Sequence, residues 1–407
     1  MISLLTFILA SAVLILCVVQ TGLVIRYYFF HNQEQPIQGT DLPQPKAAII
    51  LCLRGHEESL PDCLAGLINQ DYADYELHIA FDSPYDLAVQ QVEGFFNADM
   101  SGVQIHFFEP RQDCSYKCSG ITHVIGKLDQ NVEVVAFCDG DAMVNDQWLG
   151  TLVEPLLRDN RIGATTGNRW FSPYDGGIGG MLRKQWNAAA VVQMQAYDIA
   201  WGGSMALRRS VIDDCDLVEI WKRSFCEDTP MTVPLEKHGL KIHRIPQLVI
   251  ENRESASVTG CLEWISRQLL TVRLHHPKWK LVRAHGFATI FASLFLPLMI
   301  LLMLLCGNTK EGIWLLFAWG IYQVCNLVLL WLIQRCNLKA IASNNGLEAE
   351  NMDRRDGDLI AGVLVQLLYP VAFIAADRAQ TVSWRGVDYE ICDNGRAIRT
   401  ASAGLSP

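Results

Sequence analysis

The sequence has few charged residues and no concentration of positive charge. Only 19% of its 407 residues are charged, and the formal net charge is −10. No tract of lysine and arginine has the density typical of a nucleic-acid-binding surface, so we expect no nucleic-acid partner. Internal repeats and low-complexity segments are also absent, which excludes a repeat architecture.

The cysteines lack the spacing of metal ligands. Thirteen cysteines, an odd number, are scattered along the chain. Cys114 and Cys118 are the nearest pair, and their separation fits neither a zinc site nor a redox motif. We therefore expect reduced thiols in a reducing compartment.

Long apolar runs, by contrast, are present towards both ends of the chain. Residues 2–25 form a run long enough to cross a bilayer of about 30 Å. This run lacks the basic start and the small-residue cleavage site of a signal peptide, so we expect a retained anchor. Three further runs of spanning length cover 287–306, 313–333 and 359–376.

The distribution of these runs predicts the domain organisation. Residues 33–280 contain no such run and carry most of the charge, as expected of a cytosolic domain. We predict an anchor over 1–32, the cytosolic domain over 33–280 with an interfacial helix near 262–280, a membrane bundle of three spans over 281–378 and a tail over 379–407. Basic residues flank the last span on both sides, so they do not decide the side of the tail. A tilted or re-entrant last segment stays open.

Strand and helix patterns alternate in the first half of the predicted cytosolic domain. This order is the signature of an α/β fold with a mostly parallel sheet. Strands are expected over 46–53, 76–81, 103–108 and 134–139, and helices over 60–69, 87–96 and 116–127. In the second half we expect strands over 163–168 and 241–250, a flexible glycine loop over 176–180, and helices over 183–197 and 228–238.

The most informative stretch is the strand that ends in Asp139-Gly140-Asp141. Four apolar residues precede it and predict a strand buried on both faces. Ligands bind at the carboxyl ends of such strands. Two carboxylates there repel each other unless a cation neutralises them, and Mg²⁺ or Mn²⁺ prefers oxygen ligands. The alternative is a solvated turn, because Asp and Gly are ordinary turn residues.

Three more residues suit the binding of a nucleotide diphosphate and its displacement by an alcohol. Asp82 ends another strand of the sheet and suits a hydrogen-bond acceptor for a nucleotide. Lys117 adds a cation for a diphosphate. Asp228 suits a general base that takes the proton of an attacking alcohol. Each also has a purely structural interpretation: Asp82 as a turn residue, Lys117 as a surface lysine and Asp228 as a residue at a helix N-terminus.

Taken together, these motifs resemble the inverting family 2 glycosyltransferases. The predicted anchor, cytosolic domain and membrane bundle are similar to the ceramide glucosyltransferase group within them. The matching stretches cover most of the chain: FDSPYD (81–86), KCSG (117–120), FCDGDAMV (137–144), WGGSMALRR (201–209), EDTPM (227–231), Arg267-Gln268, and SWRG (383–386) in the tail.

The resemblance implies a GT-A type nucleotide-sugar-binding fold, a UDP-sugar donor, a divalent metal and a lipid acceptor. It implies that Asp82 binds the nucleotide, that Asp139 and Asp141 bind metal and diphosphate, and that Asp228 is the general base. Arg267 and Gln268 stand in a helix motif that helps to grip the diphosphate.

That helix motif departs from the family pattern. The family has an Arg-Trp pair after Gln or Arg, and this chain continues from Gln268 with Leu-Leu-Thr. Arg273 and Trp264 lie one turn away and are candidate substitutes.

The sequence therefore predicts an inverting, membrane-bound enzyme that transfers a hexose, expected to be glucose, from a UDP-sugar to a lipid hydroxyl such as that of ceramide. Its catalytic domain is expected to face the cytosol. Two alternatives stay open. One is a processive polysaccharide synthase, and the other is a non-catalytic membrane protein that binds a nucleotide sugar or a lipid.

Overall fold

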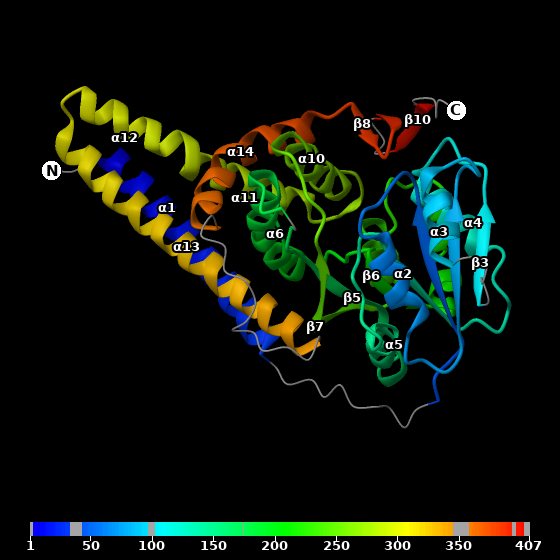
Figure 1. Ribbon diagram of the computed structural model, residues 1–407. Coiled ribbons are helices and arrows are strands. Elements are labelled where there is room, and N and C mark those ends of the chain that lie inside the picture. Colours follow the sequence, from blue (N-terminus) through cyan, green and yellow to red (C-terminus); the bar gives the residue numbers. More distant parts are fainter. Residues whose placement is uncertain are drawn as a thin grey trace.

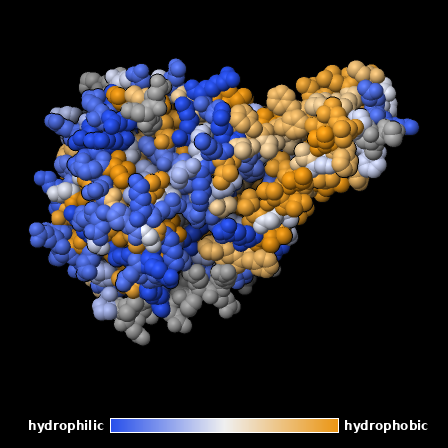
Figure 2. Space-filling model, turned by 180° about the vertical axis from the view of Figure 1, so that it is seen from behind, coloured by the Kyte–Doolittle hydropathy of each residue, from blue (hydrophilic) through white to orange (hydrophobic). Residues whose placement is uncertain are grey.

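The molecule consists of two differently built parts. The structure is a computed structural model that describes residues 3–32, 43–96, 102–173, 175–344, 358–392 and 396–402. An α/β body contains the main sheet, and an arm of long helices projects from it (Figure 1). Figure 2 shows that the body is mainly hydrophilic and the arm mainly apolar. The ends of the predicted anchor and tail, and most of the polar segment before the last span, lie outside the described residues.

The main sheet has seven strands in the order β3-β2-β1-β4-β6-β5-β7. Neighbouring strands among β1 to β4 are parallel, as predicted, while β6 is antiparallel to both β4 and β5. The strands are β1 (Ala47–Leu53), β2 (Tyr75–Phe81), β3 (Val103–Phe107), β4 (Val134–Cys138), β5 (Ile162–Phe171), β6 (Ser204–Arg208) and β7 (Lys241–Asn252).

Helices cover both faces of this sheet, which explains why its central strands are continuously apolar. In β1, Ala47, Ile49 and Leu51 face one core and Ala48 and Ile50 face the other, following the two-residue period of a strand. The first core is completed by α2 (Leu60–Ile68), α3 (Leu87–Phe96) and α5 (Trp148–Arg158), and the second by α4 (Tyr116–Ile125), α7 (Arg209–Asp214), α8 (Leu217–Trp221) and α9 (Thr232–Lys237).

Within the described residues, four helices are long and apolar enough to cross a membrane. They are α1 (Leu4–His31), the continuous α11–α12 segment (Trp279–Ile290 and Leu296–Leu305, joined by a π-helical turn), α13 (Thr309–Asn344) and α14 (Asp358–Arg378). The arm is formed by α1, α12 and α13 (Figure 1). Inside it, the buried Tyr27 hydroxyl of α1 donates to Asn337 Oδ1 of α13 at 2.9 Å.

Helix α14 follows a different course from the arm. Near its start, Asp358 pairs with Lys184 of α6 (Ile178–Tyr197) at 2.8 Å. At its end, Arg273 of α10 (Val258–His275) donates to the carbonyl of Ala376 at 2.7 Å. Both ends of α14 are therefore held against the α/β body. The charge pattern left the side of the tail undecided, and the structure places the tail against the body as a second sheet of β8 (Thr381–Trp384), β9 (Val387–Ile391) and β10 (Ala397–Ser402).

Two local predictions were wrong. The expected flexible loop at 176–180 is helical from Ile178 onward, because α6 begins there. A Cβ on Gly179 would lie 2.2 Å from the carbonyl oxygen of Ala256, so this glycine permits close packing of the helix. The expected helix over 228–238 is broken into a 3₁₀ turn, Thr229–Met231, followed by α9.

Candidate active site at the sheet edge

A cavity of about 470 Å³ lies at the carboxyl end of β1 and β4. Parallel strands bring their ends to the same edge, which is where ligands bind in such sheets. Six of the seven predicted site residues line this cavity: Lys117, Asp139, Asp141, Asp228, Arg267 and Gln268. The structure thus brings together residues that are as much as 151 positions apart in the chain, from Lys117 to Gln268.

Lys117 lies between two carboxylates. Its Nζ is 2.5 Å from Asp139 Oδ1 and 2.7 Å from Glu227 Oε1. Burial lowers the pKa of Lys117, but the two carboxylates outweigh burial and raise it well above the ordinary value. Burial also raises the pKa of Asp139, and the charge of Lys117 brings that pKa below its ordinary value. One cation cannot compensate two anions, and burial raises the pKa of Glu227 to about 7.

Asp141 is the second carboxylate of the Asp-Gly-Asp motif. Its Oδ2 accepts a hydrogen bond of 2.6 Å from Asn252 Nδ2 at the end of β7. Burial first, and then the charge of Asp139, raise the pKa of Asp141. This repulsion is what a bound divalent cation relieves.

A divalent metal fits these donors. Among the described residues, no three histidine, cysteine or acidic side chains form a complete metal cage. Mg²⁺ does not require one, because it is usually held by one or two carboxylates together with substrate phosphates and water. Asp139 and Asp141 both face the cavity and supply oxygen donors of that kind.

Asp228 has both carboxylate oxygens fixed by backbone donors. The Gly202 N–H donates to Asp228 Oδ2 at 3.0 Å, and the Thr229 N–H donates to Oδ1 at 2.7 Å. Glycine is required at 202, since a Cβ there would lie 1.6 Å from Glu227 Oε1. The Gly-Gly turn before β6 therefore helps to position Glu227 and Asp228, and backbone hydrogen bonds fix the carboxylate of Asp228 at the cavity wall.

Helix α10 contributes Arg267 and Gln268, and the structure distinguishes the two candidate substitutes. Arg267 lies over the ring of Trp384, 5.0 Å from its centre. Trp264 lines the cavity as well. Arg273 does not, because its guanidinium donates to the carbonyls at the end of α14.

Asp82 is not among the residues that line the cavity. Its carboxylate is buried and forms an ion pair with Arg54, which does line the cavity. Its Oδ1 is buried without a hydrogen-bond partner among the described residues. Burial raises the pKa of Asp82.

Arg169 is a cavity residue that the sequence did not single out. It lies on β5 and stacks over Trp264 at 4.8 Å and Trp201 at 5.2 Å. Burial lowers the pKa of Arg169, while Asp141 and Asp139 counteract that shift. Nothing in the strand pattern of 163–168 marks this arginine, because its role depends on residues far away in the chain.

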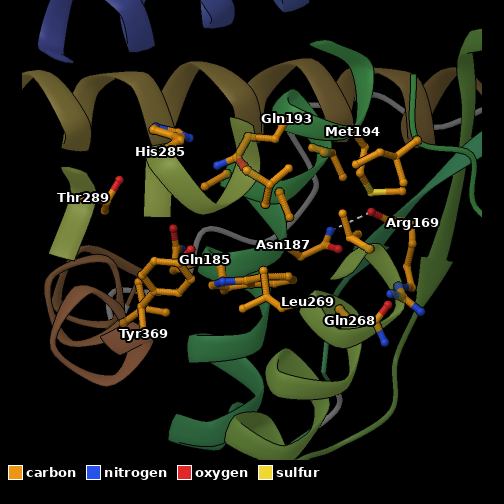
Figure 3. Close-up of a pocket in the computed structure, with 18 of the residues that line it drawn as sticks. Arg169, Gln185, Asn187, Gln193, Met194, Gln268, Leu269, His285, Thr289 and Tyr369 are labelled. Carbon is orange, nitrogen blue, oxygen red and sulfur yellow. Dashed lines mark hydrogen bonds between the residues drawn. The ribbon is translucent and has the colours of Figure 1, made fainter. Parts of the chain in front are cut away.

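A second cavity, of about 190 Å³, lies between the α/β body and the long helices. Its wall is built from α1, α6, α10, α11, α13 and α14, and most of its lining is apolar. Figure 3 shows Arg169 and Gln268 at one end of it and His285, Thr289 and Tyr369 at the other. A mainly apolar wall suits a lipid-like ligand, and polar side chains such as Gln185, Gln193 and Gln268 add hydrogen-bonding groups to it.

The two cavities share part of their walls. Six residues line both of them: Arg169, Trp201, Asp228, Trp264, Gln268 and Thr271. Asp228 is the only carboxylate among these six. A polar cavity and an apolar one therefore adjoin at a fixed carboxylate.

Comparisons with known proteins found a matching family model and several similar solved structures. The family model "Glycosyl transferase family 21" matches residues 4–397, and no curated protein sequence matches the chain. A mannosyltransferase from Pyrobaculum calidifontis, solved with GDP-mannose and Mn²⁺, is 14% identical over 91% of this chain and all of that chain, with a TM-score of 0.49. A glucosyl-3-phosphoglycerate synthase from Mycobacterium tuberculosis, solved with Mn²⁺ and UDP-glucose, is 15% identical over 55% of this chain and 78% of that chain, with a TM-score of 0.36.

The family match extends the motif resemblance. The motifs resembled family 2 and its ceramide glucosyltransferase group, whereas the matched model is that of family 21. The mostly parallel sheet with apolar helices at both ends is the GT-A type architecture that was expected. Because the model covers nearly the whole chain, this protein belongs to glycosyltransferase family 21.

Proposed function

We propose that this glycosyltransferase transfers a hexose, with inversion, from a UDP-sugar to the hydroxyl group of a membrane lipid. Ceramide is the expected acceptor and glucose the expected sugar, as for the group that the motifs resemble. The proposal depends mainly on one observation, that Asp228 lies at the junction of the polar and the apolar cavity.

The polar cavity suits the donor. Its wall combines Lys117 and Arg267 with the Asp139–Asp141 pair, a mixture of cations and metal-binding carboxylates that fits a diphosphate. A divalent metal held by Asp139 and Asp141 would neutralise diphosphate charge in the departing nucleotide. Asp82 keeps a free acceptor oxygen behind Arg54, which suits a donor group of the nucleotide.

The apolar cavity suits the acceptor. Four of the helices that form it have the length and composition of membrane spans, so a lipid can enter it from the bilayer. The hydroxyl group of that lipid would then reach the carboxylate of Asp228. Backbone N–H groups orient both Asp228 oxygens, so this base gains its efficiency from position.

The experiment is a transfer assay with the full chain in detergent and mixed lipids. UDP-sugars are tested in turn with Mn²⁺ or Mg²⁺ and then with chelator, and UDP release and glycolipid are measured. We expect metal-dependent release that rises with one lipid class. Asp228→Asn should lower transfer by about 10²–10⁴-fold and leave UDP binding nearly unchanged.

Asp214→Asn is the matched control, because Asp214 is exposed on α7 and does not line either cavity. Turnover of Asp228→Asn equal to that of the control would contradict the base assignment. A product with many sugars per lipid would favour a polysaccharide synthase, and UDP binding without any transfer would favour a binding protein.

A further inference from the structure

The turn between β8 and β9 forms part of the wall of the polar cavity. Ser383, Trp384 and Arg385 line the cavity together with the Asp-Gly-Asp carboxylates. Trp384 pairs with Val387, so Arg385 and Gly386 form a two-residue hairpin turn. Both have positive φ, +51° and +72°. Asn-Gly is preferred in such turns, and an arginine in this conformation is strained, which points to a function for its side chain.

The turn is fixed to the residues that hold the Asp-Gly-Asp motif. The ring of Trp384 lies 4.9 Å from that of Tyr116, which directly precedes Lys117. The backbone N–H of Tyr116 donates to the hydroxyl oxygen of Tyr389 on β9 at 3.0 Å. The tail sheet therefore packs against the first turn of α4, and Arg385 lines the same cavity as Lys117.

Three cations that line the cavity differ in their ion-pair partners and in the exposure of their side chains. Lys117 is shared by two carboxylates, and Arg54 is paired with the buried Asp82. Arg385 forms an ion pair with Glu57, but a third of its side chain is exposed. Burial, opposed by Arg385 and reinforced by Asp141, raises the pKa of Glu57 to about 7. Because a third of its side chain is exposed, Arg385 is the one of these three cations that a diphosphate can reach most readily.

We propose that Arg385 binds the diphosphate of the donor and stabilises it as it leaves. This inference rests on the proposed function. Trp384 supports it by stacking beneath Arg267, so that the turn and α10 present two guanidinium groups at one wall. An arginine fork matches phosphate oxygens in a bidentate way.

The chemical step balances without further reactants. The bond from the sugar C1 to the diphosphate oxygen breaks, and its electron pair leaves on that oxygen. The acceptor oxygen forms the new bond to C1, and its proton passes to Asp228. Negative charge therefore grows on the diphosphate as the bond breaks. Arg385 then separates from Glu57 and pairs with the diphosphate instead.

The test separates the guanidinium from the fold of the turn. Arg385→Gly removes the side chain and places glycine at a positive φ, where it is favoured. This gain offsets part of the cost of leaving the buried Glu57 carboxylate without its cation, so the melting temperature should change little. We expect its kcat/KM for the donor to fall by roughly 10²–10³-fold, the effect of removing one preorganised charge-stabilising donor. Its affinity for UDP should fall at least tenfold, while that for uridine should not change. Arg385→Lys should be intermediate.

The matched control is Arg378→Ala, an exposed arginine at the end of α14 outside the cavity. Arg385→Gly with UDP affinity and donor kcat/KM within threefold of the control overturns the inference. An equal loss of UDP and uridine affinity also overturns it, because the turn would then act only through structure. If the wild-type protein transfers no sugar, the proposed function fails, and the UDP-to-uridine comparison still decides the role of Arg385.

Discussion

Replacing Glu227 with glutamine tests the charge balance of the active site most directly. Glu227 shares Lys117 with Asp139 and is almost fully buried, and its pKa is raised from 4.5 to about 7. Between these two values the folded protein holds a proton that the unfolded chain has released. Stability must therefore fall as pH rises through this window, and the loss is complete above about pH 7.

The pKa values give the size of the effect. Each pH unit corresponds to about 1.4 kcal/mol, so a rise from 4.5 to about 7 destabilises the ionised state by about 3 kcal/mol. Glu227→Gln does not titrate and should escape this loss. For a domain of this size, we expect its melting temperature to exceed that of the wild type by roughly 6–12 °C at pH 8, with a much smaller difference at pH 5.

The assay is thermal unfolding in detergent at both pH values, with chelator present to remove metal from the neighbouring carboxylates. Glu57 has a pKa raised to about 7 as well, but it is present in both proteins and cancels in the comparison. Glu154→Gln serves as the control, because it removes a carboxylate whose partner, Arg158, lies on the exposed surface of α5. If Glu227→Gln follows the wild type at both pH values, Glu227 is ionised throughout and the reasoning fails.

Two further substitutions probe the same cavity. Lys117→Met should destabilise the protein by about 3 kcal/mol, the lower end of the range for a broken buried ion pair because a quarter of the Asp139 side chain is exposed. Saturating Mn²⁺ should recover more of the melting temperature in this variant than in the wild type, and an equal shift would contradict the charge-balance argument. Gly202→Ala should displace Glu227 and cost about 1–3 kcal/mol, with at least a tenfold loss of transfer. The control is Gly150→Ala, in open space on α5, which should be neutral or stabilising by up to about 1 kcal/mol. Full activity of Gly202→Ala would show that the Gly-Gly turn does not position the acids.

Local patterns in the sequence predicted much of this architecture. The apolar run before Asp139 predicted a strand buried on both faces, and helices on both sides of the sheet account for it. Alternating strands and helices predicted parallel pairing, which β1 to β4 confirm. The four long apolar helices were also visible, because length and hydropathy are properties of single segments.

Other features depend on contacts between distant segments, and these could not be read from the sequence. The glycine loop at 176–180 was a wrong prediction because the packing of Gly179 against Ala256 is not encoded locally. Arg169 and Glu57 were not assigned to the site, since strand and loop patterns do not mark which of their side chains face a cavity. Arg273 and Arg267 differ only in which face of α10 they occupy, and neighbouring helices decided their different partners.

The sequence by itself determined the alternation of strands and helices from β1 to β4, the carboxylates at the strand ends and the apolar segments, because each follows from a short-range period or a run of similar residues. Only the tertiary structure decided where the tail lies, since basic residues flank the last helix on both sides and the contacts of α14 with α6 and α10 hold it against the body. It also decided that the polar and apolar cavities adjoin at Asp228, because that junction is built from residues of β5, α10 and the segments around β6 that meet only in the folded chain.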